Sequence, residues 1–234
     1  MAFPQFVTHF DTSIGGASPF AVNMPINVAA GGLLVVQIVR LGGAQDFTFP
    51  AGWIQVANAA CLHDNSGFGG TNGQMDFFCK VTDAGDVTGP SGGSITVSSS
   101  VTASQNKAAI SMYFTGNFAA GTTPVLAETT VNTASSGSPD SPSFTPVGGA
   151  KDYLWCTAIT TSNYHLAGLY PSSYTKIRRP LIGGNPCRLG IAGRELNTAT
   201  EDPQAWSSIT VQWSAKTLAI FETTAAGRHQ ASMI

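Results

Sequence analysis

Apolar and polar residues alternate with a period of two along much of the chain, which predicts β-strands. Met75–Lys80 (MDFFCK) follows this alternation except at Phe78, and Ile95–Ser100 (ITVSSS) and Ile110–Phe114 (ISMYF) follow it too. Leu33–Val39 (LLVVQIV) is apolar on both faces, as is typical of a central strand that is covered on both sides. No segment combines the i, i+3, i+4 apolar spacing of a helix with a cap and a terminal glycine.

The second half of the chain continues the series of short strands. Its strand-like segments are Leu154–Ile159, Leu189–Glu195, Ile209–Trp213 and Leu218–Glu222. Turn-forming residues separate the strands at Gly31-Gly32, Asp83–Asp86, Gly89-Pro90, Gly148-Gly149 and Gly183-Gly184. Many short strands with Gly- and Pro-containing turns predict an all-β fold, an antiparallel β-sandwich of the jelly-roll kind.

The two halves of the chain resemble each other. MDFFCK followed by ITVSSS returns as LGIAGR followed by ITVQWS, and Lys80 and Ile95 precede Arg194 and Ile209 by the same 114 positions. Upstream, Leu34 corresponds to Leu154, which lies 120 positions later. The motif Pro50-x-x-Trp53 corresponds to Pro171-x-x-Tyr174, 121 positions later. The falling offset predicts a longer loop in the first copy, at Ala57–Gln74.

We therefore predict two pseudo-repeated strand sets, at about residues 28–116 and 147–223. The Thr-, Ser- and Pro-rich segment 119–146 joins them as a linker or as an excursion into an edge strand. The chain of 234 residues is long enough for one large β domain or two small ones. We favour a single sandwich domain over residues 1–234, because neither copy alone forms a secure closed sandwich.

Charged residues are scarce, at 10% of the chain against a typical ~25%. A polar but uncharged surface suits a protein that is packed among many copies, and equally a β-rich protein with short loops. The net charge of −2 argues against nucleic acid as the main partner. No apolar run reaches the ~18 residues of a membrane span, and Met1–Phe10 lacks the features of a signal peptide.

The four cysteines, Cys61, Cys79, Cys156 and Cys187, lack the C-x-x-C spacing of a metal or redox motif. Cys79 and Cys156 fall in apolar strand-like runs, so we expect them to be core residues. Cys61 and Cys187 fall in loop-like segments, and their pairing stays open. We expect free thiols, because we predict that the chain is made in the cytosol.

No motif for catalysis, a cofactor or a metal stands out, and we predict a protein that is not an enzyme. Asp76, Asp83 and Asp86 are compatible with a calcium site or with an ordinary hairpin turn, and their spacing favours the turn. His63 lies beside Asp64 in a Gly- and Asn-rich loop, without the partners that zinc or acid–base catalysis requires.

Two features are candidates for binding. The Pro50–Trp53 turn places an indole at the head of a strand, where it either stacks on a sugar ring or anchors the sandwich; Tyr174 at the matching place favours the anchor. The loops Ala57–Gln74, with His63 as its candidate residue, and Thr161–Arg188 are the other candidate. The second loop is rich in the Tyr and Arg typical of interfaces. Its candidate residues are Tyr164, His165, Tyr170, Tyr174, Arg178 and Arg179.

The order of the short motifs resembles a recurrent β-sandwich domain of phages and bacteria. In that family an apolar "GDLL" strand is followed by "PxGW", a "YKVADGxE" strand and turn, a Thr/Val/Ser strand and a final Trp–Ala strand. The matching segments here are Ser18–Val39, Phe47–Val56, Phe77–Asp86, Ile95–Ser100 and Ala205–Phe221. Gly32 replaces the family's Asp, and Asp86 replaces its Glu.

This resemblance implies a structural protein of the virion of a tailed bacteriophage, made in the host cytoplasm. The expected roles are capsid decoration, head spike, tail tip or tail fibre, with other virion proteins as partners and a homo-oligomer as the assembly. The family supplies no catalytic residues. The alternative is a carbohydrate-binding module for host-surface glycans, with Trp53 or the Tyr-bearing loop as its stacking platform.

Overall fold

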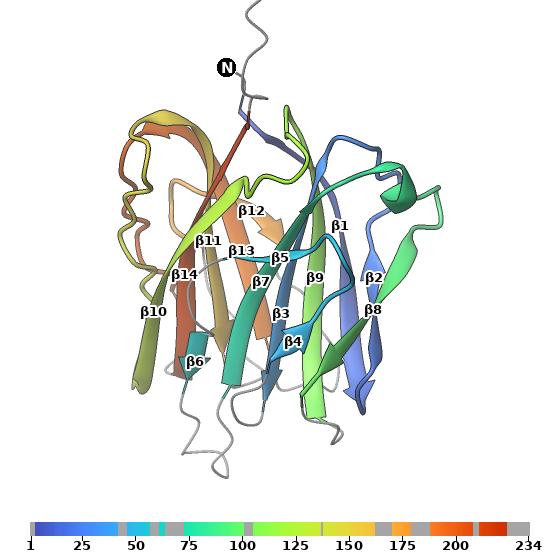
Figure 1. Cartoon of the computed structure of the whole chain (residues 1–234). Coiled ribbons are helices and arrows are strands. Elements are labelled where there is room, and N and C mark those ends of the chain that lie inside the picture. The colour runs from blue at the N-terminus through green and yellow to red at the C-terminus, as the bar shows by residue number, and fades with distance from the viewer. Residues whose placement is uncertain are drawn as a thin grey trace, which may run out of the picture.

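A computed structural model describes residues 3–41, 46–56, 61–63, 73–100, 105–136, 138–161, 170–178, 188–207 and 211–223 (Figure 1). Within these ranges the regular structure is almost entirely antiparallel β, and the one helical element is a 3-10 turn, η2 (Ala84–Asp86). The predicted all-β sandwich is confirmed.

The strands form two large sheets and one small sheet. The first sheet has the order β1-β9-β3-β7-β5, with β6 also paired to β7. Its strands are β1 (Gln5–Gly16), β3 (Leu33–Leu41), β5 (Ile54–Gln55), β6 (Cys61–His63), β7 (Gly73–Val81) and β9 (Gln105–Thr115). The second sheet has the order β10-β14-β11-β13-β12. Its strands are β10 (Val125–Ser136), β11 (Lys151–Thr161), β12 (Thr175–Arg178), β13 (Arg188–Thr198) and β14 (Val211–Phe221). The small sheet has the order β2-β8-β4, with β2 (Phe20–Met24), β4 (Phe47–Thr48) and β8 (Gly93–Ser99).

The two large sheets are built to the same plan. If β2, β4, β6 and β8 are set aside, both run through their strands in the order first, fifth, second, fourth, third. The registers agree as well. Leu33 pairs with Val81 and Phe114, just as Leu154 pairs with Glu195 and Ile220. Each half of the chain therefore supplies one large sheet.

The registers also correct the sequence comparison. The match of Lys80 to Arg194 is right, but Leu154 is equivalent to Leu33 and not to Leu34. This difference of one residue matters because neighbouring strand residues face opposite sides of a sheet. The match of Ile95–Ser100 to Ile209–Ser214 is wrong: the former lies mainly in β8 of the small sheet, whereas Val211 opens β14, whose equivalent is β9.

Three apolar clusters divide the molecule into layers. The middle cluster takes residues from both large sheets, among them Leu33 and Val35 of β3 and Leu154 and Cys156 of β11. Burial of these apolar side chains is the main force that holds the sheets face to face. The central strands β3 and β11 are apolar on both faces because their outer faces are covered too.

Different structures cover the two outer faces. The small sheet covers the first sheet, with Val22 and Val97 in a cluster with Leu34. Among the described residues, no such sheet covers the second. There, irregular segments 138–150 and 199–207 bring Trp206 onto the sheet, where its Nε1 donates to Thr157 Oγ1 at 2.9 Å. Segment 119–146 is more than a linker, since it contains the whole of β10.

Candidate functional site

The Pro50–Trp53 turn and the end of β7 meet at one end of the first sheet. The Pro50–Trp53 turn is closed by a hydrogen bond from Trp53 N to Pro50 O at 3.3 Å. Gly52 lies there at φ +87°, and an added Cβ would approach Lys80 Cε to 3.2 Å. Lys80 Nζ in turn lies 2.8 Å from Asp86 Oδ1 and 3.3 Å from Asp83 Oδ2. We call this turn, with Lys80, Asp83 and Asp86, the first joint.

Asp83 and Asp86 are held by the η2 turn itself. Asp83 Oδ1 accepts from Gly85 N at 2.7 Å, and Asp86 Oδ2 accepts from Asp83 N at 2.9 Å, which makes a capping box. The bond from Gly85 N and the contact with Lys80 lower the pKa of Asp83. The carboxylates are thus engaged in a turn, as the favoured interpretation requires, but the prediction of a hairpin is wrong: η2 joins β7 to β8, which lie in different sheets. No group of three metal-ligating side chains occurs in the described part of the chain.

The second sheet has an equivalent joint made of different residues. The Pro171–Tyr174 turn is closed by a bond from Tyr174 N to Pro171 O at 2.9 Å. Arg194, the equivalent of Lys80, binds Glu201 through Nη2 and donates from Nη1 to Ser173 Oγ at 2.9 Å. We call this turn, with Arg194 and Glu201, the second joint.

Burial distinguishes the second joint from the first. The Glu201 side chain is only 2% exposed, and its Oε1 accepts from the Tyr174 hydroxyl at 2.7 Å. The guanidinium of Arg194 lies 5.1 Å from the centre of the Tyr174 ring. Burial, followed by the bond to Glu201, raises the pKa of Tyr174 well above its ordinary range. The phenol therefore stays a hydrogen-bond donor.

A tyrosine hydroxyl fixes the turn before each central strand, although the two tyrosines come from different strands. In the first sheet, Tyr113 of β9 accepts from Ala29 N at 3.2 Å. In the second, Tyr153 of β11 donates to Gly149 O at 3.0 Å. Gly32 makes room for Tyr113, because a Cβ on Gly32 would lie 2.3 Å from the tyrosine ring. The close approach of this ring explains why glycine stands at position 32.

The structure settles the environment of three predicted binding residues. Trp53 is half-buried, packs on the cluster under the small sheet and lies 5.3 Å from the Phe49 ring centre. Tyr170 is half-buried against the cluster on the second sheet. Tyr174 is 3% exposed, so the prediction that it contacts a partner is wrong: its ring anchors the second joint.

The other predicted binding residues receive less description. His63 lies in β6 and Arg178 in β12, where the backbone is described but the side chains are not. Tyr164, His165 and Arg179 fall outside the described residues, so their predicted roles stay predictions.

Two of the cysteines are core residues, as predicted. Cys79 and Cys156 are free and fully buried in the cluster between the sheets. Burial raises the pKa of each thiol to about 12. A thiol with such a pKa is a poor nucleophile at neutral pH. The backbone of Cys61 lies in β6, and Cys187 falls outside the described residues.

Sequence reasoning missed a buried polar row on the outer face of the first sheet. Arg40 and Lys107 are neighbours on β3 and β9, and neither is exposed. Arg40 Nη2 donates to Gln74 Oε1 at 3.2 Å, and Gln74 Nε2 donates to Asp76 Oδ2 at 2.5 Å. Burial raises the pKa of Asp76 despite these polar neighbours. The signal in the sequence was that Arg40, Asp76 and Lys107 interrupt otherwise apolar strands near ends that lie side by side in the sheet.

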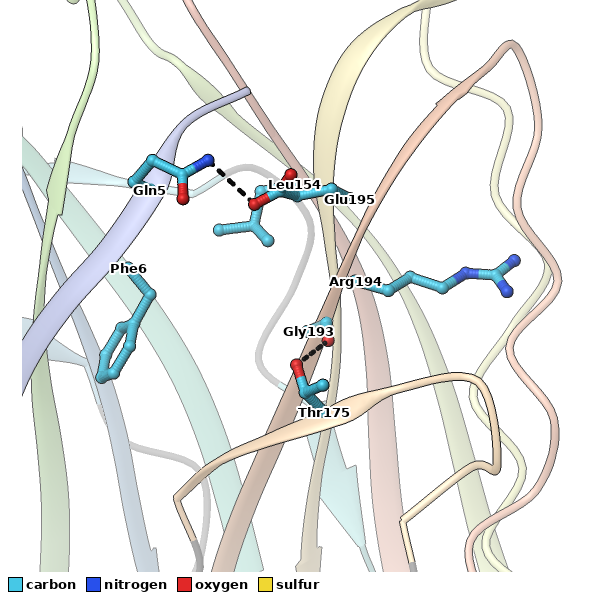
Figure 2. Close-up of a pocket in the computed structure, with 7 residues that line it drawn as sticks. All are labelled: Gln5, Phe6, Leu154, Thr175, Gly193, Arg194 and Glu195. Atoms are coloured by element: carbon cyan, nitrogen blue, oxygen red, sulfur yellow. Dashed lines mark hydrogen bonds between the residues drawn. The ribbon is translucent and has the colours of Figure 1, made fainter. Parts of the chain in front are cut away.

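A pocket of about 350 Å³ opens at one edge of the sandwich, between β1 and β13 (Figure 2). Gln5 Nε2 donates across its mouth to Glu195 Oε1 at 2.8 Å, and Thr175 Oγ1 donates to Gly193 O at 2.9 Å. Phe6 and Leu154 supply its apolar lining, and Arg194 points away. At the opposite edge of the sandwich, β6 contacts β10 and β14.

Comparison with known proteins returned no match: no family model, curated protein or solved structure is similar to this chain. No helix among the described residues is long and apolar enough to cross a membrane.

Proposed function

We propose that this chain is a non-enzymatic structural subunit of the particle of a tailed bacteriophage. It would act by protein–protein assembly at an exposed position, as capsid decoration, head spike, tail tip or fibre. The observation that carries the proposal is the first joint, where two of the five motifs of the resembling virion family, the Pro50–Trp53 turn and the Phe77–Asp86 strand and turn, meet in space. A shared set of motifs is stronger support when the residues form one structural unit.

The use of polar groups agrees with this proposal. In both joints the carboxylates are bound by a cation, and in the second joint the phenol is bound as well. Such groups position turns and leave no activated nucleophile or base among them. The features that support assembly are a surface with few charges and the exposed edges of the sheets, because both suit packing against other subunits.

The test is the composition of purified particles. Intact particles should contain the chain at a fixed ratio to the major capsid or tail protein, and antibody labelling in electron micrographs should locate it on the head or the tail. A chain that is abundant in the lysate of infected cells but absent from purified particles overturns the proposal.

Glycan recognition is a second candidate function, favoured by the edge pocket. An aromatic ring beside an amide, a carboxylate and a hydroxyl is a combination that binds sugars, and Phe6, Gln5, Glu195 and Thr175 provide it. A glycan array tests this candidate. Glu195→Ala should abolish binding if the pocket is the site, and Trp53→Ala should abolish it if the turn is the site. Failure of the native protein to bind any glycan excludes this function.

A further inference from the structure

Strand β10 is the edge of the second sheet that is best suited to pair with another chain. It has 12 residues and, within the described part of the chain, pairs only with β14. The other edges are shorter or interrupted. β5, β6 and β12 have 2, 3 and 4 residues. β1 is broken by a register shift between Phe6 and Thr8, and β2 contacts it.

The register of β10 shows which backbone groups face outward. Pro124 O accepts from Phe221 N at 3.0 Å, so this pair lies in a hydrogen-bonded position of the antiparallel ladder. Hydrogen-bonding direction alternates along a strand. The N–H and C=O groups of Val125, Ala127, Thr129 and Val131 therefore point to the free edge.

The sequence of β10 lacks the usual protection of an edge strand. Natural edges are commonly guarded by lysine, proline or a bulge near the middle. Val125–Ser136 (VLAETTVNTASS) contains no lysine, arginine or proline, and Glu128 is its one charged residue. Its register with β14 is regular from Val125 to Asn132, and its one irregularity, between Asn132 and Ser136, lies near the end of the strand. Val and Thr, which favour strands, make up 5 of its 12 residues.

We propose that β10 pairs with β10 of a second copy of this chain, antiparallel and around a twofold axis at Thr129. Two identical strands can form this isologous contact because a twofold axis makes them antiparallel. With the axis at Thr129, Ala127 is paired with the partner's Val131, and both belong to the outward-pointing set. Glu128 is then paired in register with the partner's Thr130, so no position of the ladder pairs two glutamates. The two second sheets become one continuous sheet of ten strands.

Light scattering on the purified chain tests this dimer. The native protein should have the mass of two chains at high concentration and dissociate on dilution. Thr129→Pro removes an N–H that points to the partner and none that points to β14, so it should give a monomer with unchanged circular dichroism. Thr129→Ala keeps the N–H and should remain a dimer. A native protein that is monomeric at every concentration, or a Thr129→Pro variant that dimerises as well as Thr129→Ala, overturns the proposal.

Two further measurements do not depend on the folding of the proline variant. In the native protein, hydrogen exchange at the Ala127, Thr129 and Val131 amides should be slow in concentrated solution and fast on dilution; exchange that ignores concentration contradicts the pairing. Thr130→Lys places an ammonium group opposite the partner's Glu128 and should strengthen dimerisation roughly tenfold at low salt. Asn132→Lys, which faces Leu126 in this register, should not. Equal effects would refute the register. Because these tests use the purified chain, their outcome is separate from that of the particle test.

Discussion

The two joints hold the same elements of the fold but bury their acidic residues to different degrees. In both, a Pro-x-x-aromatic turn lies against a cation on the fourth strand of its copy, and the cation binds an acidic residue six or seven positions later. In the first joint the lysine and Asp86 side chains are 15% and 14% exposed. In the second, Glu201 is nearly inaccessible and takes a third bond from a phenol.

The difference follows from what covers each sheet. The η2 turn supplies backbone donors to its own carboxylates, so the single ammonium group of Lys80 is sufficient in the first joint. In the second joint, segment 199–207 carries Glu201 onto the sheet, where a buried carboxylate requires several donors. Arginine supplies a planar fork that reaches both Glu201 and Ser173. The two copies therefore share the geometry of the joint although its polar chemistry differs.

The largest effect is expected from removing the buried acid. Glu201→Ala leaves the Tyr174 hydroxyl and the Arg194 guanidinium without their shared acceptor in a largely buried site. Breaking a buried pair costs about 3–5 kcal/mol; since Arg194 is 26% exposed, we expect about 3 kcal/mol of lost unfolding free energy in urea denaturation. Asp86→Ala, the matched change in the first joint, should cost about 1 kcal/mol or less. Equal losses would show that burial does not distinguish the joints.

A steric change in the first sheet comes next. Gly32→Ala places a methyl group 2.3 Å from the Tyr113 ring, so the ring must move away from the Ala29 turn. Overpacking of this kind costs about 1–3 kcal/mol. In a Tyr113→Ala background the same substitution should cost nearly nothing, and a double-mutant cycle measures the coupling. An additive cycle would mean that the ring does not explain the glycine.

Tyr174→Phe should have a smaller effect, because it removes one hydroxyl and keeps the ring. Glu201 loses a bond from a neutral donor but retains Arg194, and hydrogen bonds to charged groups contribute about 1.5–3 kcal/mol. We expect a loss near the lower limit, about 1.5 kcal/mol. Thermal unfolding measures this loss. Tyr170→Phe serves as the control, because Tyr170 is only half-buried at the margin of the same cluster. If the loss is no larger than in the control, the buried hydroxyl of Tyr174 does not stabilise the fold.

The sequence predicted the strands and the sandwich well, because apolar alternation and turn residues are local signals. Leu33–Val39 was recognised as a central strand from its two apolar faces, and both faces are covered. The sites were predicted less well. Tyr174 looked like an interface residue because nothing local shows that Glu201 will lie against it. The Ile95–Ile209 match failed because two Thr/Val strands look alike in different sheets. Long-range partners decided each of these cases.

The smallest effect is expected toward the far ends of the strands that carry the two joints. There the first sheet, and not the second, holds the buried acidic residue. Asp76 lies in the polar row of the first sheet, and its equivalent in the second is Gly190, beneath Trp206. Burial raises the pKa of Asp76 above its ordinary value near 3.8, so between these two pKa values the folded state binds more protons than the unfolded state. The contribution of Asp76 to the unfolding free energy is therefore greatest below its ordinary pKa and falls as pH rises through the folded pKa.

Asp76→Asn should remove this part of the pH dependence and change stability by about 1 kcal/mol or less at neutral pH. Urea denaturation of both proteins at a series of pH values measures the difference. A difference that stays constant with pH would show that Asp76 titrates alike in the folded and unfolded chain, and that the polar row compensates fully for its burial.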